Sequence, residues 1–528
     1  MRLEKKKVKR PQIEIEKEDK KPAAAAAGPS FILKDVEITG STIFKPEGLK
    51  PSYEAYLGKE VTFKDLEEIA GTIKAKYKEK GYLTTTVYIP EQDIKEGNVE
   101  IRISEGRLGE VKVEGNKWYS SSLIEKYIHV KKNEMLNIFK IQRDMLRLNQ
   151  NSDLEVRAVI SSGKEASTTD ITLKVKDNFP YHVGASFDNQ GTRLVGKDRT
   201  SVSFRSTNLT GLNDSLFVNT LMGATASGDF VSYAIPLDTY GTRLGFDFAS
   251  FDMKLGREYK ELDITGHTQI YTPHISGEIY LSEDFQANID SGIEIKSIKK
   301  RIRGEIMAND QIRLPYVAFD LAKLDTLFGG GQTIFSPRFS FNTEHFLGAS
   351  SNDHPSASRP GTGGFFFKYE QTIKRVQKMA FDSYVSVRSL FQTASDTLPS
   401  SEQLQLGGAN SVRGYPEGEY LADIGATLNV EWIFPCYIFP EELKLPYAKT
   451  PLRRQLQPII FMDLGGGKLK KTAAGEKPIR FLMGAGGGLR FQFDKNLFLR
   501  LEWAARLGDR PTPGQGPSNF YVTVQCEI

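Results

Sequence analysis

The stretch "SLFVNTLMGATASGDFVSYAIPLDTYGTRLGFDFASF", Ser215–Phe251, decides the fold of this 528-residue chain. It contains three runs rich in β-branched and aromatic residues, at 215–223, 229–237 and 242–251. Residues typical of turns separate the runs, most clearly the "DTYG" of Asp238–Gly241. The pattern predicts consecutive strands joined by tight turns.

The same pattern continues from residue 181 to Ile528 and gives about 16 strand-like runs, an even number. The connections between them broadly alternate in length. Short ones such as Asp238–Gly241 contrast with the long stretches 345–363 and 392–420. Short turns on one rim and long loops on the other are typical of membrane barrels. We therefore predict a 16-stranded antiparallel transmembrane β-barrel over residues 179–528. No window approaches the roughly 18 apolar residues of a membrane helix, but a barrel strand does not need them because only alternate residues face lipid.

Two shorter units precede the barrel, at 31–106 and 107–178, and each reads as strand, helix, helix, strand, strand. In the first unit a helix is expected from Phe63 to Lys80, with Thr62 as N-cap and Gly81 as C-cap. Each unit is predicted to be a small α+β domain whose sheet has a free edge. Such an edge can bind an extended peptide as an added strand, or it can simply pack on a neighbouring domain.

Residues 1–30 are charged and then rich in alanine and proline, which predicts a disordered arm and linker. The first residues contain no apolar h-region of a signal peptide. If the protein is exported, we expect this sequence to be a mature or trimmed form.

The composition disfavours several functional classes. A net charge of +4 gives no basis for nucleic-acid binding. The chain lacks G-x-S-x-G and H-E-x-x-H, and its six histidines are scattered, so no catalytic residue, metal site or cofactor is predicted. Cys436 and Cys526 are expected about four strands apart, or roughly 19 Å, too far for a disulfide. The basic "KSIKKRIR" of Lys296–Arg303 is predicted to be a solvated loop on the long-loop rim, and the "GAGGG" of Gly484–Gly488 to mark a bend in a barrel strand.

Four short motifs carry a resemblance to a known family. They are a Pro-Glu-Gln turn in the first small domain, an Asp-Asn-x-Gly opening of the barrel, a Val-Arg-Gly-Tyr loop and a Phe-x-Asp-x-Gly strand. Their residues are Pro90, Glu91 and Gln92; Asp188, Asn189 and Gly191; Val412, Arg413, Gly414 and Tyr415; and Phe461, Asp463 and Gly465. Together with the doubled unit and the strand count, they make the chain resemble the two-partner secretion outer-membrane transporters (the TpsB family), from Phe31 onwards. The small units then correspond to POTRA domains.

By the count of strand-like runs, the arginine loop joins the eleventh and twelfth barrel strands and Asp463 lies on the thirteenth, and these are the positions that the resemblance implies. The resemblance also implies that the loop folds back into the barrel, where the guanidinium group of Arg413 can pair with Asp463 in a bidentate manner. Gly414 would let the backbone pass close to the wall, and Tyr415 would supply an apolar body with a polar tip. We expect a partly wet lumen and hence a pair weaker than a buried one.

The resemblance implies a protein-conducting pore in the outer membrane of a Gram-negative cell, with both POTRA domains in the periplasm. Its partner would be an unfolded, β-rich exoprotein of the β-helical kind, which the pore exports or, as for a haemolysin, also activates. Outer-membrane lipid and lipopolysaccharide would surround a monomer. The alternative is a factor that inserts other barrels into the membrane, although such factors generally carry more POTRA domains. Two features depart from the family, since the last strand ends in Ile528 instead of an aromatic residue and residues 1–20 show no amphipathic plug helix.

Overall fold

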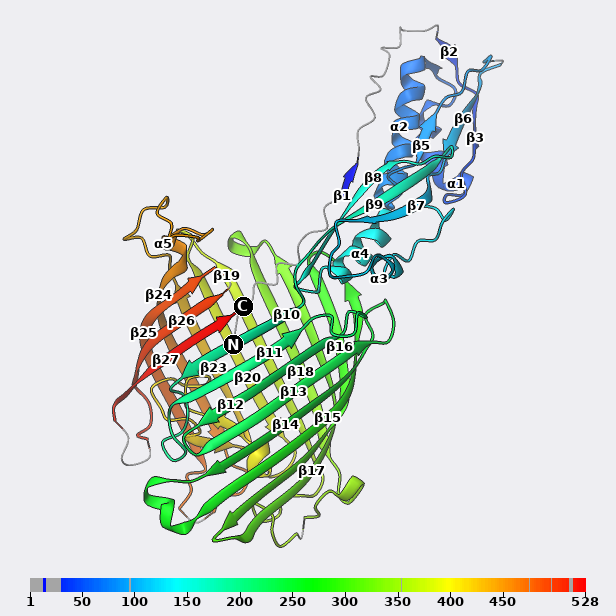
Figure 1. The fold of residues 1–528 in the computed structure, drawn as a ribbon. Coiled ribbons are helices and arrows are strands. Elements are labelled where there is room, and N and C mark those ends of the chain that lie inside the picture. The colour runs from blue at the N-terminus through cyan, green and yellow to red at the C-terminus, as the bar shows by residue number, and fades with distance from the viewer. Residues whose placement is uncertain are drawn as a thin grey trace. The chain divides into compact units, whose positions relative to one another are not determined.

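A computed structural model describes residues 13–15, 30–94, 96–352, 354–473, 475–494, 496–511 and 516–528. The chain divides into two compact units, Met1–Phe179 and Pro180–Ile528. The first contains both small α+β domains and the second is the barrel (Figure 1). None of the helices in the described residues is long and apolar enough to cross a membrane.

The first small domain packs a three-stranded sheet, in the order β3-β6-β5, against helix α2. Strand β3 runs parallel to β6, and β5 runs antiparallel to it. The core lies between α2 and the sheet because the helix presents one apolar face, as its sequence predicts. The elements are β2 (Phe31–Ile32), β3 (Asp35–Thr39), α1 (Pro46–Leu49), η1 (Lys50–Ser52), η2 (Glu54–Tyr56), β4 (Glu60–Val61), α2 (Phe63–Glu79), β5 (Thr86–Tyr88) and β6 (Asn98–Ser104).

Both predicted ends of α2 have a physical cause. Thr62 and Asp65 form a capping box at the first turn, which satisfies backbone donors that the helix leaves free. The helix ends at Glu79, and Gly81 then adopts a left-handed φ of 88°. The carbonyl oxygen of Gly81 accepts a hydrogen bond from the amide of Ile138 in the second domain, at 2.8 Å. The end of α2 is therefore also part of the contact between the two domains.

The second small domain repeats this plan with the sheet order β1-β8-β9-β7. Strands β8 and β9 are antiparallel, and β7 runs parallel to β9. Its core is formed by α3, α4 and the covered face of this sheet. The elements are β7 (Arg107–Glu114), α3 (Ser121–Lys126), α4 (Ile138–Leu148), β8 (Leu154–Ser162) and β9 (Thr168–Asp177).

The N-terminal arm differs from the expectation of disorder at one place. Residues Ile13–Ile15 form strand β1, which pairs parallel to β8 and occupies that edge of the second sheet. An unpaired edge is an open row of backbone donors and acceptors, so any extended segment within reach can add to it. The expected plug-helix region, residues 1–20, otherwise lies outside the described residues.

The barrel is closed and antiparallel, and its strands follow chain order from β10 to β20 and then from β23 to β27. It therefore has the 16 strands that the sequence predicts. These are β10 (Tyr181–Asp188), β11 (Arg199–Ser206), β12 (Ser215–Gly223), β13 (Ala226–Pro236), β14 (Arg243–Lys254), β15 (Ile264–Leu281), β16 (Phe285–Ile302), β17 (Glu305–Asp325), β18 (Gly331–Asn342), β19 (Phe366–Lys378), β20 (Tyr384–Ala394), β23 (Ile424–Ile433), β24 (Leu456–Lys468), β25 (Ile479–Phe493), β26 (Leu497–Arg506) and β27 (Ser518–Glu527).

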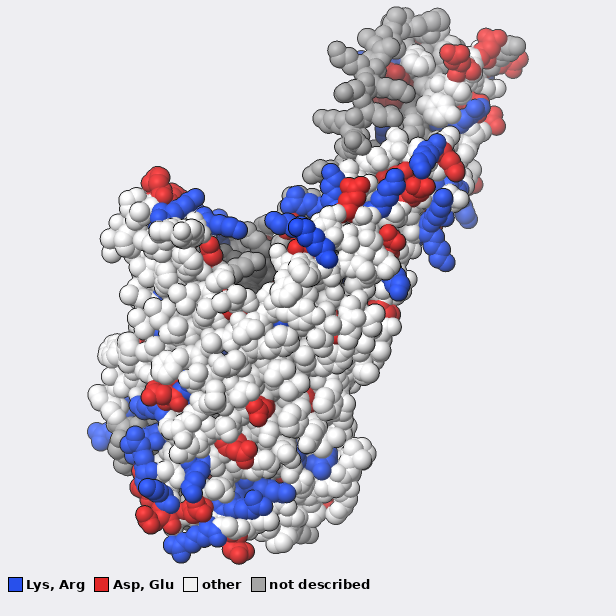
Figure 2. All heavy atoms as spheres, viewed as in Figure 1, with Lys and Arg blue, Asp and Glu red and all other residues white. Residues whose placement is uncertain are grey.

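Alternation along the strands separates the lumen from the outer face. On β24, Ile460 and Met462 are 54% and 41% exposed, whereas Phe461 and Asp463 are 5% and 0% exposed. Apolar side chains thus point outward and Asp463 points inward, as in a strand whose outer face meets lipid. In Figure 2 the barrel shows a broad uncharged belt across its upper half, and charged residues gather toward its lower rim.

Three details of the predicted barrel are wrong. The run 277–295 resembles a single strand in the sequence, but it contains a turn, because β15 ends at Leu281 and β16 begins at Phe285. The basic stretch Lys296–Arg303 is not a loop, since residues up to Ile302 continue β16 and Lys296 is paired with carboxylates inside the barrel. The long-loop rim also carries two tight connections, β12 to β13 and β16 to β17.

Candidate functional site

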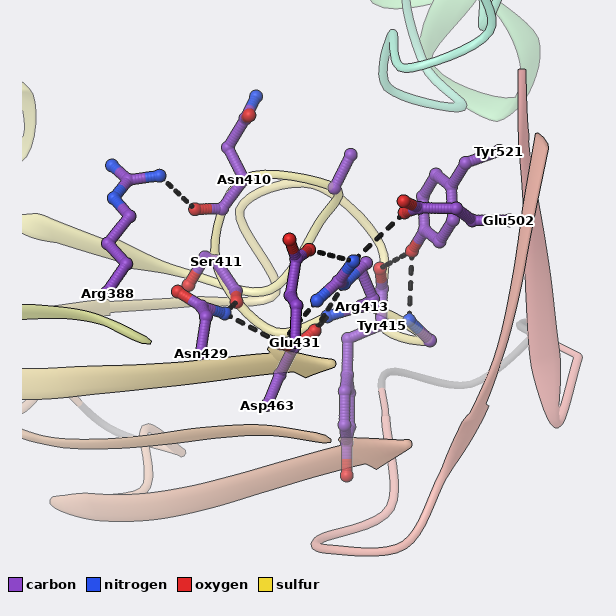
Figure 3. Close-up of polar contacts among 12 residues, drawn as sticks. Arg388, Asn410, Ser411, Arg413, Tyr415, Asn429, Glu431, Asp463, Glu502 and Tyr521 are labelled. Carbon is purple, nitrogen blue, oxygen red and sulfur yellow. Dashed lines mark hydrogen bonds and ion pairs between the residues drawn. The ribbon is translucent and has the colours of Figure 1, made fainter. Parts of the chain in front are cut away.

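The loop that carries the Val-Arg-Gly-Tyr motif runs from the end of β20 to the start of β23, over residues 395–423. The predicted loop, 392–420, thus starts inside β20 and ends at the start of β22. A short hairpin of β21 (Leu404–Leu406) and β22 (Tyr420–Ala422) stiffens its stem. At its tip, Val412 and Tyr415 are fully buried and the Arg413 side chain is 2% exposed. The tip therefore packs against the inner wall of the barrel (Figure 3).

Arg413 and Asp463 form a bidentate ion pair. Nε of Arg413 donates to Oδ2 of Asp463 at 2.6 Å, and Nη2 donates to Oδ1 at 2.8 Å. The backbone amide of Arg413 also donates to Oδ2, at 3.1 Å. The structure thus brings together the two residues expected to meet, on the loop between the eleventh and twelfth strands and on the thirteenth strand.

The sequence did not predict two further carboxylates that hold the same guanidinium group. Nη1 of Arg413 donates to Oε1 of Glu431 on β23 at 2.7 Å and to Oε2 of Glu502 on β26 at 3.0 Å. Arg490 and Arg500 pair with these carboxylates from the wall, so the cluster holds three acidic and three basic groups. Glu431 and Glu502 each precede an outward-facing tryptophan, Trp432 and Trp503, in an apolar run. A charged residue at an inward position of such a strand is the signal in the sequence that could have predicted a lumen site.

The wall is shaped to let the loop approach. The Cζ atom of Arg413 lies 3.4 Å from the ring centroid of Phe461, so this predicted motif residue stacks on the guanidinium group. A Cβ atom at Gly465 would lie 2.6 Å from the Val412 side chain, and one at Gly484 would lie 1.9 Å from the Arg413 carbonyl oxygen. Gly484, predicted to mark a strand bend, is therefore required for close contact between loop and wall.

Gly414 and Tyr415 continue the attachment toward the last strands. Gly414 has a φ of 94°, and its amide donates to the hydroxyl of Tyr521 on β27 at 2.9 Å. The hydroxyl of Tyr415 donates to the carbonyl of Asp509 at 2.9 Å. Tyr415 thus combines a fully buried ring with a satisfied polar tip.

The expectation of a wet, weak pair is wrong. The side chains of Asp463 and Glu502 are 0% exposed and that of Arg413 is 2% exposed. Charges withdrawn from water are stabilised only when they are paired and hydrogen-bonded, and removal of one partner of such a buried pair typically costs about 3–5 kcal/mol. The cluster meets this requirement because hydrogen bonds bind Asp463 to Arg413 and to Asn429, whose Nδ2 donates to it at 2.9 Å.

The Asp-Asn-x-Gly motif lies at the seam where the barrel closes between β10 and β27. The side-chain amide of Asn189 makes the hydrogen bonds that a peptide group of a neighbouring strand would make. Its Nδ2 donates to the carbonyl of Phe520 and its Oδ1 accepts from the amide of Val522, both at 2.9 Å. Asp188 pairs with Arg199 on β11 at 2.8 Å. A Cβ atom at Gly191 would lie 2.1 Å from the carbonyl oxygen of Gly196, so the connection after β10 requires glycine there.

The seam also holds the last residue. Val183 and Ile528 exchange two backbone hydrogen bonds, at 3.0 and 2.9 Å. Ile528 therefore takes part in the strand pairing of the seam.

The Pro-Glu-Gln motif has a structural place in the first small domain. Nε2 of Gln92 donates to the carbonyl of Glu100 at 2.8 Å, and Oε1 of Gln92 accepts from the amide of Glu100 at 2.7 Å. Gln92 thus continues the pairing along β6 beyond the end of β5, and Pro90 and Glu91 lead the chain into this position. Glu91 is exposed at this turn.

In the part of the chain that the structure describes, no group of three or more His, Cys, Asp or Glu residues could hold a metal ion. Cys436 and Cys526 are free thiols, the first buried and the second exposed.

Comparison with known proteins supports one class. The family model for the haemolysin secretion/activation protein ShlB/FhaC/HecB matches residues 167–491, and the model for the ShlB-type POTRA domain matches residues 31–106. The heme/hemopexin transporter protein HuxB of Haemophilus influenzae strain Rd is 24% identical over 464 residues, which cover 84% of this chain and 78% of HuxB. The outer membrane transporter CdiB of Dickeya dadantii is 22% identical over 407 residues, 74% of this chain and 70% of CdiB.

Solved structures show the same fold. CdiB from Escherichia coli superposes with a TM-score of 0.76 at 18% identity, covering 96% of this chain and 92% of that one. BamA from Haemophilus ducreyi lacking POTRA domains 1–3 gives a TM-score of 0.53 at 13% identity, covering 94% and 100%. Both are likenesses of fold. Because the ShlB/FhaC/HecB model covers more than half of the residues, the chain belongs to the haemolysin secretion/activation family of two-partner secretion outer-membrane transporters.

Proposed function

We propose that this transporter binds an extended segment of an unfolded, β-rich exoprotein on its periplasmic POTRA sheets and passes the chain through the barrel to the cell surface. The observation that carries the proposal is the Arg413 loop tip, held by a buried ionic cluster inside a closed 16-stranded barrel. A passive porin for small solutes would need neither this attachment nor the two small domains.

The sheets offer a physical basis for substrate binding. Strand β1 lies parallel to β8, which supports the idea that this edge accepts an extended segment from another part of a chain. Backbone hydrogen bonds supply affinity in such additions and tolerate many sequences. An exoprotein segment would replace β1 at the same edge.

The alternative function is insertion of other barrels into the membrane. This function would require the seam between β10 and β27 to open sideways. Asn189 argues against that reading, because its side chain adds two hydrogen bonds across the seam beyond the strand ladder. We further propose that the transporter acts as a monomer surrounded by outer-membrane lipid and lipopolysaccharide, as the outward-facing apolar residues of β24 suggest.

Reconstitution into liposomes would test the function. The probe is a β-rich polypeptide of the β-helical kind, presented unfolded on the POTRA side. We expect it to reach the opposite compartment, where protease added to the probe side no longer digests it. Failure to cross, combined with insertion of an unfolded eight-stranded barrel into the same liposomes, would instead support the assembly function. Whether the exported protein is also activated would show as gain of its activity after passage.

A further inference from the structure

The loop has a second buried ionic attachment, at Glu402 near the start of its stem. Glu402 ends the short helix η6 (Ser400–Glu402), and its side chain is 1% exposed. Nζ of Lys296 on β16 donates to Oε1 of Glu402 at 2.8 Å, and Nζ of Lys368 on β19 donates to Oε2 at 2.9 Å. The carbonyl of Glu402 also accepts a hydrogen bond from Gln392 on β20, at 3.2 Å.

The two attachments use different parts of the wall. Lys296 and Lys368 belong to the seventh and tenth strands of the closed ring of sixteen, whereas the partners of Arg413 belong to the twelfth, thirteenth and fifteenth. The polarities of the two attachments are opposite, because the loop contributes an acid to the first attachment and a base to the second. The loop therefore bridges two separate parts of the inner wall, and ion pairs of Glu419 with Arg480 and of Asp423 with Arg359 hold the end that leads into β23. Displacement of the loop from the lumen would require at least one of the two attachments to open.

The two attachments differ in how easily they can separate. Both lysines already contact a second carboxylate on their own strand, Lys296 with Glu294 at 2.7 Å and Lys368 with Glu370 at 3.2 Å. If Glu402 leaves, each ammonium group keeps a partner, and the freed carboxylate can be hydrated. If Arg413 leaves, the three carboxylates of its cluster face only Arg490 and Arg500, and an unpaired buried charge is expensive.

We propose that Glu402 is the releasable latch of this loop: the pore opens by separation of Glu402 from Lys296 and Lys368 while Arg413 stays bound. Glu402 is thus a positioning residue for transport, and the inference rests on the proposed function. The wall lysines are suited to this role because an ammonium group on a flexible stem can exchange partners, whereas the forked guanidinium group of Arg413 is fixed in one geometry.

Single-channel recording on the purified full-length protein in planar lipid bilayers tests the latch without any exoprotein. We expect Glu402→Gln to raise the open fraction about tenfold, which corresponds to about 1.4 kcal/mol. Glu370→Gln should lower the open fraction, because it removes the partner that Lys368 keeps after release. Glu402→Lys should open the pore most, and Lys368→Glu added to it should restore closure. Glu305→Gln, an exposed carboxylate at the start of β17, is the matched control and should behave like the parent.

A folding control separates a change in gating from a loss of structure. Heat-modifiable migration in gels verifies that every variant barrel is folded, and Lys296→Gln replaces Glu402→Gln if the latter does not fold. Parental gating in folded Glu402→Gln, or increased opening in Glu370→Gln, would overturn the latch. Failure of exoprotein transport with the expected gating changes would instead count against the proposed function alone.

Discussion

The carbonyl oxygen of Arg413 occupies the place where a side chain at Gly484 would begin, since a Cβ atom built there lies 1.9 Å from that oxygen. No real Cβ approaches an oxygen so closely, so the loop backbone or strand β25 would have to move. The arginine motif and the glycine-rich strand are therefore two halves of one contact. This contact determines how deeply the loop tip is inserted.

Gly484→Ala should displace the loop tip without unfolding the barrel. Backbone atoms cannot yield as a flexible side chain would, so we expect the Arg413 hydrogen bonds to lengthen and secretion to fall at least tenfold. Gly277→Ala on β15 is the control, because the nearest atom to its added Cβ is a side-chain carbon at an ordinary 3.8 Å. Secretion by Gly484→Ala at the level of Gly277→Ala would contradict this account.

Arg413→Ala should leave the protein inserted in membranes while secretion falls sharply. It leaves the buried carboxylates of Asp463 and Glu502 and the partly buried one of Glu431 beside two arginines, and the loss of a partner in such a cluster costs about 3–5 kcal/mol. The thermal midpoint of the folded barrel in gels should fall accordingly. Arg413→Lys should fail almost as fully, because the single nitrogen of an ammonium group cannot reproduce the bidentate pair with Asp463 while also donating to Glu431 and Glu502.

The control for both arginine variants is Arg454→Ala, since this side chain is about half exposed and lies outside the lumen cluster. It should secrete normally. Normal secretion by Arg413→Ala would remove the anchoring role of the motif.

The sequence predicted what depends on local pattern. The 16 strands and the helix α2 with its Thr62 cap are present in the structure. The meeting of Arg413 with Asp463 is present too, but it was expected from the family resemblance and not from local pattern. Glu431 and Glu502 were missed because their contact with Arg413 depends on how β23 to β26 align across the wall, which no single strand encodes. The same reason explains the error at Lys296–Arg303. A run of like charges is typical of a solvated loop. The carboxylate that pairs with Lys296, Glu402, lies far away in the sequence and could not be paired with it from the sequence alone.

Asn189→Ala should weaken the closing seam. It removes two side-chain hydrogen bonds to β27, worth about 0.5–1.5 kcal/mol each. Hydrogen–deuterium exchange of the peptide containing Val522 should accelerate, while peptides from β17 and β18 keep their protection. Asn219→Ala on β12, away from the seam, should leave exchange at Val522 unchanged. Equal protection of Val522 in the Asn189 and Asn219 variants would show that the strand ladder alone holds the seam.

Glu105, in the first POTRA domain, should make the backbone around Thr42 and Ile43 sensitive to acid. Burial alone would raise the pKa of Glu105, but hydrogen bonds from Thr42, Ile43 and Tyr77 outweigh it and hold the pKa below its ordinary value. A carboxyl group with a lowered folded-state pKa contributes stability that is complete above its unfolded pKa, about 4.3. That contribution is lost as the pH falls through the folded-state pKa.

The expected result is faster hydrogen–deuterium exchange at the Thr42 and Ile43 amides of the full-length protein once the pH falls below about 4, after correction for intrinsic exchange. Glu105→Gln keeps the shape of the side chain but cannot titrate, so its exchange should be faster at neutral pH and show no added acceleration in acid. Glu47→Gln, an exposed acid in helix α1, should follow the parent at every pH. If the acceleration in acid survives in Glu105→Gln, the titrating group is not Glu105, because this substitution removes the only group of that side chain that can be protonated.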